Sequence, residues 1–127
     1  MSRVLIADDN SMIRRQIRTI LELDHDLQIC AEAVNGADAV EKAQSFAPDV
    51  AVMDVVMPVM DGLRATRKIR DLAPNVRVLI FAFDNSAQLE WESFQAGADA
   101  VLAKGEGSSK LAAMVHSLGE RPRAQAN

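Results

Sequence analysis

Three aspartates and one lysine of this chain each stand directly after a short apolar run. Asp8 and Asp9 follow the run VLIA, Asp54 follows VAVM, and Lys104 follows AVLA. Carboxylates that are packed together repel one another and are costly to bury, so a cation is needed among them. Oxygen ligands without His or Cys favour Mg²⁺, which binds a few carboxylates and keeps several waters. The pattern therefore predicts a metal-assisted phosphoryl site.

Each of these residues has an expected role. Asp9 and Asp54 are expected to bind Mg²⁺ directly, and Asp8 directly or through a water. The backbone carbonyl of Val56 is expected to add a further oxygen. Asp54 is the expected nucleophile, because a carboxylate can form an aspartyl phosphate, and Lys104 would supply a positive charge for a phosphate oxygen. The alternative, a solvated cluster of aspartates beside an unrelated lysine, is disfavoured because Asp54 and Lys104 stand at corresponding strand ends.

Short apolar runs alternate along the chain with segments of helical periodicity, which predicts a parallel sheet covered on both faces. Strands are expected near 3–7, 28–34, 49–54, 76–82 and 99–103, and helices near 11–23, 36–46, 63–72, 86–96 and 108–118. Asn10 or Ser11 is expected to cap the first helix, and Asn85 or Ser86 to start the fourth. In an open, doubly wound sheet the ligand site lies beyond the carboxyl ends of the strands, where the four residues above are expected.

Length and composition set the class of protein. The chain has 127 residues and a formal charge of -4, which fits one domain and gives no reason to expect nucleic-acid binding. No apolar run approaches the ~20 residues that would span a membrane, and the N-terminus enters a strand pattern without a signal peptide, so a cytoplasmic protein is expected.

Cys30 has no partner for an internal disulfide and is expected to pack as a small apolar side chain. Residues 1–118 are expected to form the domain, and residues 119–127 a flexible tail or linker stub.

The joint pattern resembles the response-regulator receiver domain of two-component signalling over roughly residues 2–118. The resemblance is carried by Asp8-Asp9, Asp54, Met57-Pro58, Met60-Asp61-Gly62, Ala96-Gly97-Ala98 and Lys104. It implies a flavodoxin-like (βα)5 fold and Mg²⁺-dependent transfer of a phosphoryl group to Asp54 from a histidine kinase or phosphotransfer protein. Such a domain catalyses only its own phosphorylation and dephosphorylation. At Arg14-Arg15 and Asp99 the chain most resembles receivers that are attached to helix-turn-helix DNA-binding domains.

Three positions depart from the family pattern. Where the family has Thr or Ser at the end of strand four, this chain has Ala82, and the neighbouring Phe83 also lacks a hydroxyl. Val101 stands where the family often has an aromatic residue. With Lys104, these residues occupy the positions that the resemblance assigns to phosphate binding and switching. Gly105 replaces a Pro, which predicts a trans Lys104–Gly105 bond and a more mobile loop after it.

The sequence leaves other functions and partners open. A degenerate receiver that acts as a phosphate-independent interaction module is favoured by Ala82 and Val101 and opposed by the acidic site. A phosphohydrolase or nucleotide-binding enzyme is disfavoured, because Val56 stands where a second Asp is needed and no Gly-rich loop follows the first strand. The resemblance implies a partner face on helix four, strand five and helix five, which includes Trp91, and it leaves a homodimer open. His25 and His116 are expected to be surface or satisfied histidines.

Overall fold

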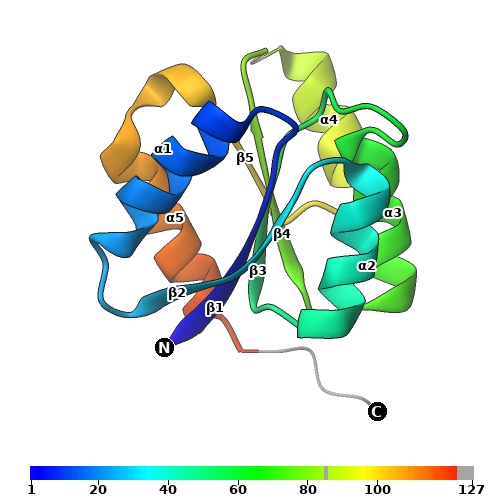
Figure 1. The fold of residues 1–127 in the computed structure, drawn as a ribbon. Coiled ribbons are helices and arrows are strands. Elements are labelled where there is room, and N and C mark those ends of the chain that lie inside the picture. The colour runs from blue at the N-terminus through cyan, green and yellow to red at the C-terminus, as the bar shows by residue number, and fades with distance from the viewer. Residues whose placement is uncertain (85, 123–127) are drawn as a thin grey trace.

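Five parallel strands form one sheet at the centre of the molecule (Figure 1). The computed structural model describes residues 1–84 and 86–122, apart from the side chain of residue 108. The strands are β1 (Ser2–Ala7), β2 (Leu27–Ala33), β3 (Val50–Met53), β4 (Arg77–Ala82) and β5 (Ala100–Ala103). Their order in the sheet is β2-β1-β3-β4-β5. The direction of winding reverses between β1 and β3, so the expected ligand site lies there, at the carboxyl ends of these strands.

Helices cover both faces of the sheet. They are α1 (Ser11–Glu22), α2 (Gly36–Phe46), α3 (Gly62–Leu72), α4 (Ala87–Ala96) and α5 (Ser108–Glu120), with a short 3₁₀ turn at Lys104–Glu106. Helices α1 and α5 lie on one face, and α2, α3 and α4 lie on the other (Figure 1). The predicted doubly wound, flavodoxin-like fold is confirmed, and the element bounds differ from the expected ones by at most two residues.

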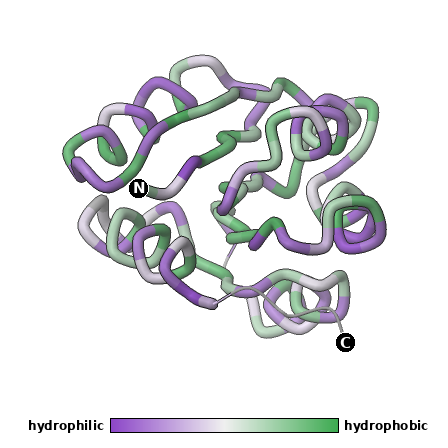
Figure 2. The backbone as a smooth tube through the Cα atoms, turned by 90° about the horizontal axis from the view of Figure 1, so that it is seen from below, coloured by the Kyte–Doolittle hydropathy of each residue, from purple (hydrophilic) through white to green (hydrophobic). Residues whose placement is uncertain are grey.

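The core has two layers, one on each face of the sheet. Alternate residues of β1 separate between them: Leu5 packs towards α2–α4, and Ile6 packs towards α1 and α5. Every residue of β4 is buried, as expected for a central strand of a parallel sheet. Figure 2 shows apolar residues along the strands, whereas the helices alternate between polar and apolar residues. The strands are therefore held rigidly, and their carboxyl ends can present side chains at defined positions.

Capping side chains fix where two helices begin. The Asn10 side chain accepts hydrogen bonds from the backbone N–H groups of Met12 (2.9 Å) and Ile13 (3.1 Å) at the start of α1. The Ser86 hydroxyl accepts one from Leu89 N–H (3.0 Å) at the start of α4. Of the two residues expected to start that helix, Ser86 caps it, and Asn85 lies outside the described residues.

Helix α5 continues two residues beyond the expected domain end. Gly119 and Glu120, which the sequence placed in the tail, form its last turn. A Cβ atom on Gly119 would lie 2.2 Å from the Ser2 hydroxyl oxygen, so the glycine lets this turn pack against the start of β1. Residues 123–127 of the expected tail lie outside the described residues. Within residues 1–84 and 86–122, no helix is both long enough and apolar enough to span a membrane.

Candidate functional site

The parallel ladder continues for one residue past the ends of β1 and β3 and brings two carboxylates together. The backbone N–H of Asp8 donates to Ala33 (3.1 Å), and that of Asp54 donates to Ala7 (2.9 Å). Asp8 is 1% exposed and Asp54 is 9% exposed. Asp8, Asp9 and Asp54 each offer a carboxylate oxygen, and these oxygens lie within 4.8 Å of one another. The predicted acidic cluster is therefore present at the switch point of the sheet.

Lys104 reaches this cluster from the far side of β4. Its Nζ lies 3.0 Å from Oδ2 of Asp8 and 3.2 Å from Oδ1 of Asp54, and its side chain is only 7% exposed. Because β4 separates β3 from β5, the Lys104 side chain extends past the end of β4 to reach these carboxylates. The predicted proximity of Lys104 to the expected nucleophile is confirmed.

The loop between β3 and α3 holds Asp54 in place through tight backbone contacts. A Cβ atom on Gly62 would lie 1.8 Å from the carbonyl oxygen of Asp54, so only glycine fits at this approach. The N–H of Gly62 donates to the carbonyl of Val55 (2.8 Å). The Asp61 side chain accepts from Arg64 N–H (2.8 Å) and caps α3. These contacts explain why an Asp-Gly pair stands at the end of the loop that follows Asp54.

The electrostatics of the cluster fit a divalent cation. Burial raises the pKa of Asp54, and the charge of Asp8 raises it further, whereas the Lys104 ammonium and the Val55 N–H act in the opposite direction. Three carboxylates beside one ammonium leave two excess negative charges, and of the three aspartates Asp8 and Asp54 have low exposure whereas Asp9 is exposed. Mg²⁺ places its oxygen ligands about 2.0–2.1 Å from the metal, so opposite ligands are about 4 Å apart. The carboxylate oxygens of Asp8, Asp9 and Asp54 lie within 4.8 Å of one another, and this all-oxygen donor set suits Mg²⁺.

A cavity of about 550 Å³ opens beside Asp54. On the β4–α4 side it is lined by Ala82, Phe83, Asp84 and Leu89. No described residue that lines it carries a hydroxyl side chain. The nearby hydroxyl of Ser86 caps α4 and also donates to Oδ2 of Asp84 (3.3 Å), so it does not replace the missing group.

Of the other predicted site residues, one lines the cavity beside Asp54 and another lies away from it. Val56 lines the cavity and is 80% exposed, and the binding of a metal by its carbonyl stays a prediction. Val101 pairs with Ile80 and packs in the apolar layer beneath α2–α4, away from the lining of the cavity. The Lys104–Gly105 bond is trans, as the sequence predicted.

Arg14 is a site-supporting residue that the sequence did not identify. Its side chain is only 16% exposed, although it lies on the first turn of α1. Its Nη1 donates to the Asp8 carbonyl (2.8 Å), and its Nε donates to Glu32 (3.0 Å). Little in the sequence indicated this role. Glu32 lies on β2 and Arg14 on α1, and the two side chains come together only when the helix packs beside the strand.

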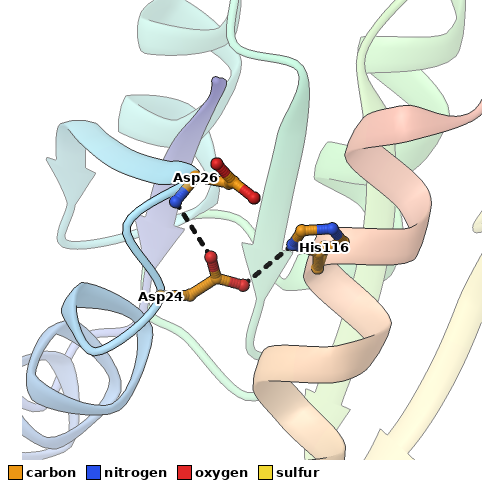
Figure 3. Close-up of side chains that lie close together, drawn as sticks. All are labelled: Asp24, Asp26 and His116. Atoms are coloured by element: carbon orange, nitrogen blue, oxygen red, sulfur yellow. Dashed lines mark hydrogen bonds and ion pairs between the residues drawn. The ribbon is translucent and has the colours of Figure 1, made fainter.

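A second group of candidate ligands lies at the opposite end of the sheet. His116 Nδ1 is 2.8 Å from Oδ2 of Asp24, whose other oxygen accepts from Asp26 N–H at 2.9 Å (Figure 3). His116 Nε2 lies 2.6 Å from Glu120. The hydrogen bond with Asp24 and the charge of Glu120 raise the pKa of His116. The prediction of a satisfied histidine is confirmed for His116, and of its two acidic neighbours only Asp24, 92 positions away, is brought to it by the fold.

The family model for the response regulator receiver domain matches residues 4–116. This chain belongs to that family. It is a receiver domain of two-component signalling. A protein-glutamate methylesterase/protein-glutamine glutaminase of Pseudoalteromonas translucida is 42% identical over 80% of this chain. The transcriptional regulatory protein LnrK of Bacillus subtilis is 35% identical over 82% of it. The receiver domain spans 26% of the length of the first relative and 47% of the second.

Solved structures have the same fold over nearly the whole receiver domain. A LuxR-family two-component response regulator from Aurantimonas sp. SI85-9A1 has a TM-score of 0.91 and 27% identity, covering 98% of this chain and 89% of that one. A CheX-CheY-BeF3-Mg+2 complex from Borrelia burgdorferi contains a chain with a TM-score of 0.87 and 26% identity, covering 94% of this chain and 90% of that one.

Proposed function

We propose that this receiver domain accepts a phosphoryl group on Asp54 from the phosphohistidine of a sensor kinase or phosphotransfer protein. The observation that carries the proposal is the position of the Asp54 carboxylate, beside Asp8 and Lys104 and next to the cavity at the switch point. A carboxylate oxygen of Asp54 attacks phosphorus and forms a P–O bond. The P–N bond breaks, its electron pair returns to the imidazole of the donor, and that imidazole takes up a proton.

The other residues of the site have separate tasks in this transfer. Lys104 would bind an oxygen of the incoming phosphoryl group, since its ammonium already lies 3.2 Å from Asp54. Mg²⁺ bound by Asp9 and Asp54, with Asp8 and the carbonyl of Val56 completing the set, would neutralise charge on the phosphoryl group. The domain catalyses only its own phosphorylation and dephosphorylation, and it works in the cytoplasm.

The phosphate-dependent response is expected to be atypical. A hydroxyl at position 82 would donate a hydrogen bond to a phosphoryl oxygen, and Ala82 provides none. Transfer should therefore be slower and the change in conformation weaker than with Thr at this position. Val101 lacks the aromatic ring that the family often has at this position for coupling the site to the α4–β5–α5 face.

A second candidate function is a phosphate-independent interaction module. It is favoured by Ala82, Val101 and two exposed aromatic side chains on α4, Trp91 (64% exposed) and Phe94 (47% exposed). A downstream partner, or a second copy of the chain, would bind the α4–β5–α5 face. This candidate requires that the site take no phosphoryl group.

Intact mass after incubation with Mg²⁺ and a small acyl phosphate separates the two candidates. The parent is expected to gain one phosphoryl group, Asp54→Asn to gain none, and the matched control Asp71→Asn on the exposed end of α3 to behave as the parent. Equal labelling of Asp54→Asn would show that another residue is the acceptor. A parent that binds Mg²⁺ but is labelled neither by the acyl phosphate nor by a phosphorylated kinase would support the interaction module.

A further inference from the structure

An aromatic ring lies directly over the ammonium group of the active-site lysine. Phe83 follows the last residue of β4, and the centre of its ring is 4.4 Å from Nζ of Lys104. The Phe83 side chain is 77% exposed, whereas that of Lys104 is only 7% exposed. The ring thus leaves most of its own surface in water while it covers a cation at the edge of the core.

The contacts of Lys104 account for its low exposure. An ammonium group has three N–H donors, and two carboxylates accept from it, Asp8 at 3.0 Å and Asp54 at 3.2 Å. The ring face of Phe83 carries negative partial charge and attracts the cation from a further direction. The ammonium is therefore held between two carboxylates and one ring.

We propose that Phe83 is a positioning residue for phosphoryl transfer, which holds the Lys104 ammonium beside Asp54. The proposal rests on the function proposed above. Among the described residues that line the cavity, Lys104 is the one cation, and Ala82 offers no hydrogen-bond donor from its side chain. The placement of Lys104 then decides how well the charge of the phosphoryl group is neutralised. A flexible lysine would lose entropy at that step, and the ring removes this cost beforehand.

Replacing Phe83 by an aliphatic side chain tests the charge distribution of the ring independently of its volume. Phe83→Leu keeps most of the apolar volume but has no ring face, and Phe83→Trp keeps a ring face that is better for a cation. Phe46→Leu is the matched control, because Phe46 is also exposed (41%) but ends α2, away from the cavity. None of these side chains lies in the core, so the variants are expected to fold.

The first readout concerns the contact itself and does not depend on phosphorylation. The ring current should shift the ε-methylene protons of Lys104 upfield of those of the other three lysines. Phe83→Leu should remove this shift, and Phe46→Leu should retain it. A parent in which Lys104 shows no upfield shift would overturn the proposal.

The second readout is the rate of phosphorylation by a small acyl phosphate with Mg²⁺. Phe83→Leu should lower the rate about five- to thirtyfold, which corresponds to about 1–2 kcal/mol for a desolvated cation–π contact. Phe83→Trp should stay near the parent rate, and so should Phe46→Leu. Equal rates for the parent and Phe83→Leu would overturn the role in transfer. A parent with the upfield shift that is labelled neither by the acyl phosphate nor by a phosphorylated kinase would instead overturn the function proposed for Asp54 and restrict Phe83 to holding the ion pair.

Discussion

The substitution Ala82→Thr adds a hydroxyl to the cavity beside Asp54, whose described lining residues carry none. Ala82 is the last residue of β4, is 4% exposed and pairs with Ala103 of β5. Its side chain lines the cavity of about 550 Å³ beside Asp54, so two additional heavy atoms have room on that side. Threonine is also favoured in strands, and the sheet should therefore accept it.

The size of the effect follows from the charge of the new partner. A hydrogen bond to a charged group contributes about 1.5–3 kcal/mol. If the bond forms in the transition state of transfer, the rate should rise about 13- to 160-fold. If it forms only in the phosphorylated product, the rate should stay constant while the phosphorylated domain becomes more stable and changes conformation more fully.

Two assays distinguish these cases. Intact mass against time measures the rate, and the fluorescence of Trp91, the single tryptophan, reports on α4, which begins shortly after β4. Ala82→Val is the matched control, because Val has the shape of Thr without the hydroxyl. If Ala82→Thr and Ala82→Val give the same rate and the same phosphate-dependent fluorescence, the missing hydroxyl does not limit this domain and the reasoning is refuted.

Three further predictions concern the structure around the site and at the opposite end of the sheet. Gly62→Ala should lower the free energy of unfolding, measured by urea denaturation, by about 1–3 kcal/mol or more. The reason is that the new Cβ would lie 1.8 Å from a backbone oxygen. Gly105→Ala is the control and should change the free energy of unfolding little, because no atom lies within 4 Å of its Cβ. Arg14→Gln should weaken Mg²⁺ binding about tenfold in calorimetry, since it loses the hydrogen bond that supports the acidic loop; unchanged affinity would show that the loop holds itself. His116→Gln should cost stability below the ordinary histidine pKa of about 6.5 and progressively less as pH rises through the raised pKa of the folded protein. The backbone N–H of Asp26, and to a lesser extent His116, lower the pKa of its partner Asp24. The stabilisation by the His116–Asp24 pair is therefore lost at acid pH, as pH falls through the folded-state pKa of Asp24. A difference in urea midpoint between the parent and His116→Gln that does not vary with pH would contradict this coupling.

Local patterns in the chain were sufficient to predict the fold and the acidic cluster. Apolar runs of strand length and capping residues such as Asn10 are short-range signals, and the structure has them as expected. Because parallel strands share one carboxyl edge, the positions of Asp8 and Asp54 at strand ends were enough to place them together.

Contacts between distant residues were decided only by the tertiary structure. Lys104 and Asp8 are 96 positions apart, and their distance depends on the order of the strands, in which β4 lies between β3 and β5. The pairing of Arg14 with Glu32 and the ring of Phe83 over Lys104 depend in the same way on how neighbouring elements pack. A sequence pattern shows which face or end of an element a side chain occupies. Which side chains meet there depends on strand order and on the space left between elements, and both arise only when the whole chain has folded.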